Sequence, residues 1–362
     1  MLVEILIILI KVLAVLGMVM PMAGLLGWIE RKGSALIHDR IGANRASIFG
    51  FAGAGLVNTL MADPLKFATK EDVIPRGADR LLHTLAPCVN LFPVLVAFAV
   101  LPFGDVLLVG DREINLQIAP LGIGVMYVLA MMSLGVYGVV LGGWASNNRW
   151  SLLGGIRGSA QMISYELPMG LAVVAMILTY GTLDLQEMAR AQGQLLWGWL
   201  PAWGILYQPL AFLIFLVAGI AESKRIPFDL PESEAELISG YFTEYSGMKH
   251  LMFFMTDFVE VVIVSALVAT LFFGGWQVPY LFASGFVFPG GATIDLPNLV
   301  VVLLQMASFT FKIIFFCWFQ IMIRWTIPRF RYDQLMHLGW LGLLPLGFVN
   351  IVATAIIIMV RQ

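Results

Sequence analysis

The chain has 362 residues, of which 60% are hydrophobic and only 12% are charged, and its mean hydropathy is +0.89. A soluble domain carries about 25% charged residues, so this composition excludes a soluble globular protein and indicates a polytopic helical membrane protein. The net charge of −2 gives no indication of nucleic-acid binding. The two cysteines and four histidines lie too far apart to match a metal site or a cluster-binding motif.

Eight apolar segments predict an all-α bundle, because about 20 apolar residues cross a bilayer as a helix. The predicted spans are residues 2–28, 81–104, 117–143, 159–181, 205–221, 253–273, 297–323 and 338–360. The first is too long for a signal peptide and lacks a basic start, so it is predicted to be a span. Pro279, Gly285 and Pro289 argue against a ninth crossing. With no visible repeat or linker, residues 1–362 are predicted to form a single integral membrane domain.

Positive charge alternates between the loops that join these spans. The odd-numbered loops carry 16 Lys and Arg residues, whereas the even-numbered loops and the C-terminal tail carry 3. The positive-inside rule therefore predicts that the odd loops face the cytoplasm or matrix and that both termini lie on the other side. In the long first loop, residues 48–67 are moderately apolar but contain Asn58, Asp63 and Lys66. This pattern predicts a helix that lies in the membrane interface.

Carboxylates inside two predicted spans are candidates for proton transfer. Glu166 falls about eight residues into the fourth span, roughly 12 Å along the helix axis. A carboxylate at that depth must be paired, hydrated or protonated, so a proton relay is favoured over a structural hydrogen bond between helices. Asp257 and Glu260 share a helix face near the start of the sixth span. They could compete for one proton, or they could stabilise the helix N-terminus.

The densest group of ionisable residues is the loop of residues 222–249. Its acidic residues are Glu222, Asp229, Glu232, Glu234, Glu236 and Glu244, and its bases are Lys224, Arg225 and Lys249. Pro227 and Pro231 predict a non-helical path through its middle. Ionisable groups beside a bilayer are costly to desolvate, which favours a functional cluster. The alternative is an ordinary solvated loop.

The first and seventh loops carry the remaining charged motifs. The first loop contains Glu30-Arg31-Lys32, Asp39-Arg40-Ile-Gly-Ala-Asn-Arg45 and Asp63-Pro-Leu-Lys66, whose positive charge the topology alone would explain. The seventh contains Pro328-Arg-Phe-Arg-Tyr-Asp-Gln-Leu335, a mixture of aromatic residues and arginines typical of an interface anchor or a docking surface. No strand precedes Gly53-Ala-Gly55, so a dinucleotide-binding fingerprint is excluded.

Together these motifs resemble the H-type membrane subunit family of proton-pumping NADH-quinone oxidoreductase, respiratory complex I. The resemblance covers residues 30–334 in the family's order. It rests on the motifs above and on Ser151-Leu-Leu-Gly-Gly-Ile-Arg157, Ile163-Ser-Tyr-Glu166, Ala221-Glu-Ser-Lys-Arg-Ile-Pro-Phe-Asp-Leu-Pro-Glu232 and Glu236-Leu-Ile-Ser-Gly-Tyr-Phe-Thr-Glu-Tyr245. Membrane-bound hydrogenases have a related subunit, but Pro-Phe-Asp-Leu-Pro-Glu followed by Glu-Tyr-Ser-Gly is similar to the quinone-linked branch.

The resemblance implies a subunit without a redox centre, not catalytic alone, that forms the floor of a quinone chamber. Peripheral-arm partners would hold NADH, FMN and iron–sulfur clusters, and the other partners would be antiporter-like and small membrane-arm subunits. The positions that match the quinone channel are Arg31, Arg40, Asp63 and Phe228. The positions that match an acidic funnel toward the proton path are Glu166, Glu222, Asp229, Glu232, Glu234, Glu236 and Asp257.

Two positions depart from the family pattern. Ala43 replaces the usual proline of the first-loop motif, and Asp257 stands where the family usually has glutamate. The resemblance also implies a location in a bacterial cytoplasmic membrane or a mitochondrial inner membrane. The alternative functions are a membrane subunit of a hydrogenase complex, an ion-coupled secondary transporter and a structural membrane anchor.

Overall fold

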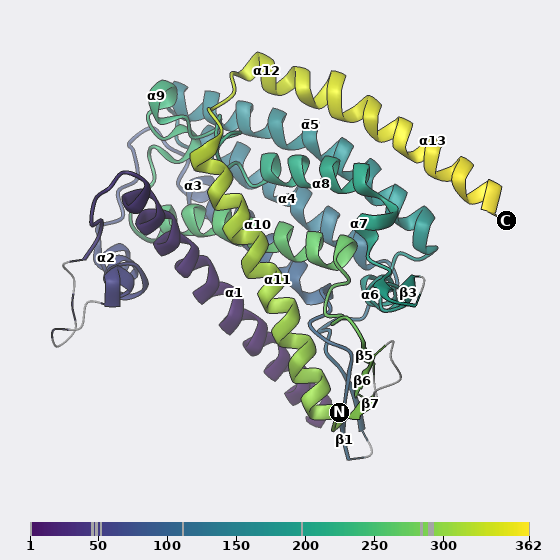
Figure 1. Cartoon of the computed structure of the whole chain (residues 1–362). Coiled ribbons are helices and arrows are strands. Elements are labelled where there is room, and N and C mark those ends of the chain that lie inside the picture. The colour runs from purple at the N-terminus through teal and green to yellow at the C-terminus, as the bar shows by residue number, and fades with distance from the viewer. Residues whose placement is uncertain are drawn as a thin grey trace.

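Long apolar helices make up most of the computed structural model, which describes residues 2–44, 47, 50, 53–110, 112–196, 198–282, 285–288 and 293–361 (Figure 1). Within these residues, seven helical segments are long and apolar enough to cross a membrane, and the helix at Pro209–Glu222 is a shorter apolar one. The predicted all-α polytopic bundle is therefore confirmed.

Each predicted span overlaps one of these segments. They are α1 (Leu2–Ile37), α3 (Arg80–Ala97), α4 (Gly124–Ala145), α5 (Arg149–Tyr180), α8 (Pro209–Glu222), α10 (Gly247–Phe272), α11 (Asn298–Thr326), and α12 (Tyr332–His337) continued by η5 (Leu338–Leu343) and α13 (Leu344–Arg361). The shorter helical elements are η1 (Gly53–Gly55), η2 (Asn58–Ala62), α2 (Asp63–Thr69), η3 (Phe98–Val100), α6 (Leu185–Ala191), α7 (Gly204–Tyr207), α9 (Glu234–Leu237) and η4 (Gly240–Phe242).

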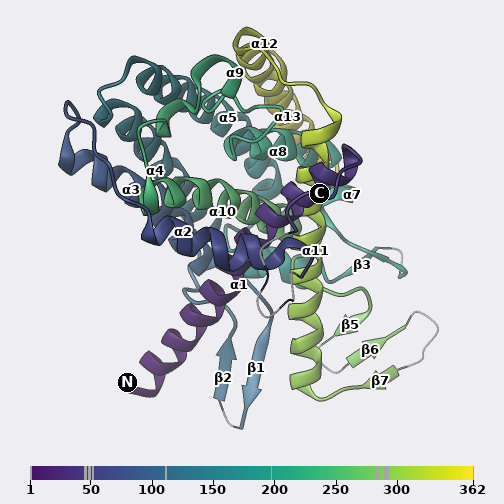
Figure 2. The same ribbon diagram turned by 90° about the vertical axis from the view of Figure 1, so that its left-hand side faces the viewer.

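Helix α10 occupies the centre of the bundle. In its most apolar 18-residue window 78% of the residues are buried, against 6% in the corresponding window of α1. It packs against α1, α3, α8 and α11, and Figure 2 shows it crossing behind α2. A helix that is apolar on all sides lies either in a protein core or in the membrane, and the burial of α10 places it in the core of the bundle. The carboxylates that α10 carries are therefore held in the protein interior rather than at its lipid-facing surface.

Helix α5 begins ten residues before the predicted span. Asn148 caps its N-terminus by accepting a hydrogen bond from the Trp150 backbone N–H at 3.0 Å. The helix ends at Gly181, which adopts φ +70°. The predicted boundary was wrong because the charged Arg157 ended the apolar count, whereas the helix continues beyond the apolar region. As a result, Arg149 and Arg157 lie on a helix rather than in a loop.

The helix predicted in the first loop is present, but it begins later than expected. A turn of π-helix, η2, leads into α2, with Pro64 in the first turn. These elements pack against α1 and α10. The N-terminal part of the predicted helix includes residues 48, 49, 51 and 52, which lie outside the described residues.

Small antiparallel sheets lie at the opposite end of the bundle from α2, α9 and α12 (Figure 1). Their strands are β1 (Val106–Val109), β2 (Arg112–Asn115), β3 (Leu195–Leu196), β4 (Leu200–Pro201), β5 (Leu281–Phe282), β6 (Gly285–Val287) and β7 (Thr293–Asp295). They pair in the orders β1–β2, β3–β4 and β5–β6–β7. The expectation that residues 278–288 do not form a ninth span agrees with the strands found there.

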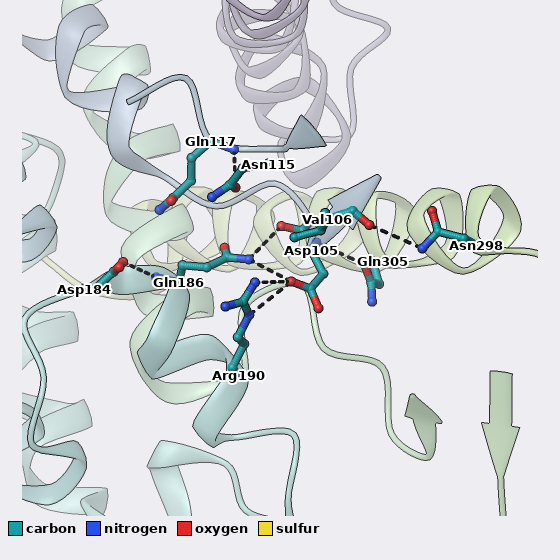
Figure 3. Close-up of polar contacts among 10 residues, drawn as sticks. Asp105, Val106, Asn115, Gln117, Asp184, Gln186, Arg190, Asn298 and Gln305 are labelled. Carbon is teal, nitrogen blue, oxygen red and sulfur yellow. Dashed lines mark hydrogen bonds and ion pairs between the residues drawn. The ribbon is translucent and has the colours of Figure 1, made fainter. Parts of the chain in front are cut away.

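A polar cluster joins the β1–β2 hairpin to α6 and α11 (Figure 3). The Asp105 carboxylate accepts hydrogen bonds from Arg190 Nε at 3.1 Å and Nη2 at 2.7 Å, and from Gln186 Nε2 at 3.2 Å. The Asp105 backbone N–H donates to Gln305 Oε1 at 3.1 Å. Asn298 accepts from the Leu108 N–H at 2.9 Å. These contacts connect segments that are far apart in the sequence at the end of the bundle away from the candidate site.

Candidate functional site

The end of the bundle that carries α2, α9 and α12 contains a charged cavity of about 460 Å³. It is lined by Glu30, Arg31, Ser34, Arg40, Gly42, Ala43, Arg324 and Trp325. Three arginines and one glutamate give its wall an excess of positive charge. The Glu30 carboxylate pairs with Arg324, and it lies 3.3 Å from Arg225 Nη1. Glu30 therefore links α1 to α11 and to the loop that follows α8.

A second, apolar cavity of about 290 Å³ lies between α1, the η2–α2 segment and α10. Its lining includes Met20, Gly24, Leu60, Phe254 and Met255, together with Arg31 and Asp63. Arg31 lines both cavities, and its guanidinium pairs with the Asp63 carboxylate. An ion pair thus marks the boundary between a charged space and an apolar one.

The structure gathers three of the four residues predicted for the channel. Arg31, Arg40 and Asp63 line the cavities, whereas Phe228 lines neither. Phe228 is buried, with its ring centroid 5.3 Å from that of Phe330 and 5.5 Å from that of Tyr165. Its backbone carbonyl accepts a hydrogen bond at 2.8 Å from Gln161 Nε2, which also donates to the Ala221 carbonyl at 2.7 Å. Phe228 therefore fixes the loop to α5 and does not face either cavity.

The loop of residues 222–249 places its acidic side chains in different surroundings. Asp229 Oδ2 accepts a hydrogen bond from Arg329 Nη2 at 2.8 Å. Burial raises the pKa of Asp229 to about 6, although Arg329 and Arg225 lower it. Burial, followed by the charges of Asp257 and Asp229, raises the pKa of Glu232 well above its usual range. Both of these carboxyls are therefore able to hold a proton at a higher pH than an exposed carboxyl.

The other two predicted loop residues do not add to this inward-facing group. Glu236 is more than half exposed and pairs with Arg157 Nη1 at 2.6 Å. The side chain of Glu234 lies outside the described part of the structure. The interpretation of this segment as an ordinary solvated loop therefore fits Glu236 and does not fit Asp229 or Glu232.

The carboxylates within the spans are Glu166, which is partly buried, and Asp257 and Glu260, which are buried. Glu166 on α5 accepts a hydrogen bond from Ser133 on α4, so the structural hydrogen bond considered from the sequence is present. Asp257 and Glu260 on α10 are 3% and 2% exposed. Because α10 begins at Gly247, Glu260 lies thirteen residues beyond its start. Stabilisation of the helix N-terminus therefore does not explain Glu260, because that effect is confined to the first turn.

Sequence reasoning passed over Lys224, which lies at the centre of this group. Its side chain has no exposed surface, and its Nζ lies 3.1 Å from both Asp257 Oδ1 and Glu260 Oε1. Burial alone would lower the pKa of Lys224, but the charges of Glu260 and Asp257 outweigh it and raise the pKa above the usual value. The sequence signal was a lysine two residues after the buried Glu222, in an otherwise acidic segment.

Ion pairs and longer-range charge interactions relate these residues to one another, and together they are called the carboxylate row below. Glu232 interacts with Asp229 and Asp257, Lys224 joins Asp257 to Glu260, and Glu222 interacts with Glu260 and Glu166. The row is Asp229, Glu232, Asp257, Glu260, Glu222 and Glu166, with Lys224 at its middle. Within the described residues, His, Cys, Asp and Glu nowhere gather in threes that could hold a metal ion. The chemistry that the row can perform is the binding and exchange of protons.

These features define a multi-pass membrane protein in which a cationic cavity lies beside buried carboxylates. The sequence profile of a family described as NADH dehydrogenase matches residues 10–355. An H-type NADH-quinone oxidoreductase subunit of Cytophaga hutchinsonii is 44% identical over 92% of this chain and 91% of its own length. The protein of the same name from Geobacter metallireducens is 44% identical over 97% of this chain and 96% of its own length. The corresponding protein of Thermomicrobium roseum is 42% identical over 94% of this chain and 93% of its own length.

The chain belongs to the family of H-type NADH-quinone oxidoreductase subunits. The resemblance predicted from the sequence motifs is confirmed, and the chain is a membrane subunit of an oxidoreductase complex. Family membership favours this interpretation over the hydrogenase subunit, the transporter and the structural anchor.

The pKa of Asp229 leads to a prediction about stability. The folded chain raises that pKa from 3.8 to about 6, so it binds the proton more tightly than the unfolded chain does. The stability contributed by this group is therefore present at low pH and is lost as the pH rises through about 6. For the detergent-solubilised complex, we expect the unfolding temperature of Asp229→Asn to depend less on pH in this range than that of the unmodified complex. The matched control is Glu236→Gln, on an exposed carboxylate of the same loop, and an unchanged plot for Asp229→Asn would contradict the prediction.

Proposed function

We propose that this subunit forms a quinone-binding chamber with partner subunits and couples quinone reduction to proton translocation. The main support is a continuous connection from an apolar cavity to the carboxylate row. The ion pair Arg31–Asp63 lies where the apolar cavity meets the cationic cavity. Glu30, which lines the cationic cavity, pairs with Arg225, the residue next to Lys224 of the row. The names of the relatives refer to NADH and quinone. Neither cavity is explained by a purely structural role.

The two cavities suit the two parts of a quinone. The apolar cavity, lined by α1, η2 and α10, would take a hydrophobic tail, because its wall offers mainly aliphatic and aromatic groups. The polar head would pass Arg31 and Asp63 into the cationic cavity, where Arg40 and Arg324 would oppose developing negative charge. The electrons would come from NADH through the FMN and iron–sulfur clusters of peripheral-arm partners, so this chain would not be catalytic alone.

Proton coupling would act through the carboxylate row. Reduction of a quinone to a quinol takes up two electrons and two protons and so changes the charge of the chamber while it proceeds. In a low-dielectric interior that change acts over a longer distance than in water. The pair Glu30–Arg225 links the cationic cavity to the loop that carries the row, and Asp229 of the row pairs with Arg329. Protonation or rearrangement of the row would then bias the proton path in neighbouring antiporter-like and small membrane-arm subunits.

The orientation of the chain follows from the same proposal. The basic odd-numbered loops would face the cytoplasm or matrix and meet the peripheral arm, and both termini would lie on the other side. The membrane would be a bacterial cytoplasmic membrane or a mitochondrial inner membrane, with residues 1–362 as a single domain. The cavities and the inward-facing loop carboxylates lie at the end formed by these basic loops, which supports this orientation.

The experiment that tests the proposal is Glu166→Gln in the assembled complex. We expect the rate of proton translocation to fall roughly tenfold or more, because a barrier higher by about 1.4 kcal/mol slows a step tenfold. The measurement compares NADH oxidation with acidification in vesicles. Glu187→Gln is the control, because Glu187 is exposed and bonded to Thr182 at the hairpin end. Unchanged proton transfer in Glu166→Gln would remove Glu166 from the row.

A further inference from the structure

Lys224 is a buried cation on a loop rather than on a helix. It follows the end of α8 by two residues and adopts φ +54°, a left-handed conformation that is uncommon for residues other than glycine. Its backbone N–H donates to the Ala221 carbonyl at 3.3 Å, which holds the turn against the end of α8. The side chain then lies entirely within the bundle. A fully buried ammonium requires compensating negative charge.

Two carboxylates share this ammonium. Glu260 Oε1 accepts a hydrogen bond from Lys224 Nζ at 3.1 Å. Asp257 Oδ1 lies at the same distance but accepts no hydrogen bond within the described residues. Glu260 Oε2 also has no hydrogen-bond partner there. The ammonium therefore stands at the same distance from two acceptors, and each carboxylate keeps an oxygen without a hydrogen-bond partner among the described residues.

The charges of this triad require one proton in addition to that of the ammonium. With both carboxylates ionised, Lys224, Asp257 and Glu260 would carry a net charge of −1 in a site without solvent. Such an excess is costly, so one carboxyl holds a proton. The ammonium stabilises as an anion whichever carboxylate it contacts more closely. The position of Lys224 therefore determines which of the two carboxyls is protonated.

Lys224 is directly coupled to the wall of the cationic cavity through its neighbour in the sequence. Arg225 pairs with Glu30, which lines that cavity, and its guanidinium lies 4.0 Å from the centre of the Phe258 ring on α10. Successive residues thus face opposite ways, one toward the cavity and one toward the carboxylate row. A shift of Arg225 would be transmitted to Lys224 through a single peptide unit.

We propose that Lys224 is a positioning residue that moves between Asp257 and Glu260 and so directs their shared proton along the carboxylate row. In each step one O–H bond breaks on one carboxyl and one forms on the other, while Lys224 stays protonated and no electron moves. The inference rests on the proposed function. The other titratable and charged groups that act on the triad are Arg225, Asp229, Glu232, Tyr241, Glu222 and His250, and Glu166 acts on Glu222.

The test uses the variant Lys224→Met/Glu260→Gln in the complete complex, reconstituted into phospholipid vesicles with NADH and a soluble quinone. This pair of changes removes one positive and one negative charge, so the net charge of the site is kept and the complex is expected to assemble. The proton then has one carboxyl, Asp257, and no alternative position. We expect protons moved per NADH to fall about fivefold or more. Proton transfer at the level of the unmodified complex would show that Lys224 only neutralises buried charge.

A second variant keeps the test decisive if the first does not assemble. Glu260→Gln leaves Lys224 and Asp257 as a neutral pair without a shared proton, and the same loss of proton transfer is expected. Glu166→Gln serves as the reference for the row. If Glu166→Gln loses proton transfer and the Lys224 and Glu260 variants retain it, the role of Lys224 is refuted and the proposed function stands. If all of them retain it, the proposed coupling through the row fails as well.

Discussion

Replacing Gly240 with alanine is expected to prevent the acidic loop from reaching its position and to abolish assembly of the complex. Gly240 adopts φ +58°, and a Cβ atom there would overlap the Pro231 carbonyl oxygen and lie 3.0 Å from the Glu232 Cα. Both obstacles are backbone atoms, and the loop cannot retreat easily because Arg329 holds Asp229. Strain and overpacking together should cost about 3–5 kcal/mol.

Gly181→Ala is the matched control for that variant. Gly181 also has a left-handed conformation, φ +70°, but no atom lies within 4 Å of a Cβ at its position. It should therefore show only the conformational cost, about 1–2 kcal/mol. The amount of assembled complex in membranes and its unfolding temperature are the measurements. Equal behaviour of the two variants would contradict the close packing of Gly240 against Pro231.

Hydropathy predicted the spans because bilayer thickness imposes a length that composition reveals. It did not predict where helices end. Asn148 caps α5 in the aqueous region, where apolar counts carry no information. The β1–β2 hairpin lies wholly within the loop predicted between the second and third spans, but its strands were not predicted. Local sequence cannot show whether Val106–Val109 forms a strand or part of a helix, because the strand depends on pairing with Arg112–Asn115.

In the candidate site, too, the sequence predicted individual residues but not the contacts between them. The resemblance pointed to Arg31 and Asp63, whereas Glu166 was also conspicuous as an ionisable residue within an apolar span. The pairing of Lys224 with Glu260 spans 36 residues and depends on the turn that folds the loop back onto α10. Phe228 was predicted near a channel by resemblance alone, and the rings that it contacts, Tyr165 and Phe330, come from distant helices and loops. These contacts are products of tertiary structure, which no single motif records.

Filling the apolar cavity from α1 is expected to block quinone reduction while leaving the rest of the complex working. Gly24 lines this cavity, and a Cβ there would come within 2.9 Å only of the flexible end of Leu60. In Gly24→Phe the ring would occupy much of the space of about 290 Å³. We expect the rate with a long-tailed quinone to fall about tenfold or more, and the rate with a short-tailed quinone to fall less.

Gly17→Phe is the control, because Gly17 lies two turns earlier on the same helix, does not itself line either cavity and has no atom within 4 Å of a Cβ. Both variants add the same ring to α1, so only the cavity distinguishes them. NADH oxidation by a water-soluble acceptor reports on assembly and should be unchanged in both. A selective loss in Gly24→Phe would mean that the tail passes between α1, η2 and α10. Equal rates in the two variants would mean that quinone reaches the chamber by another path, and the Arg31–Asp63 pair would then need a different role.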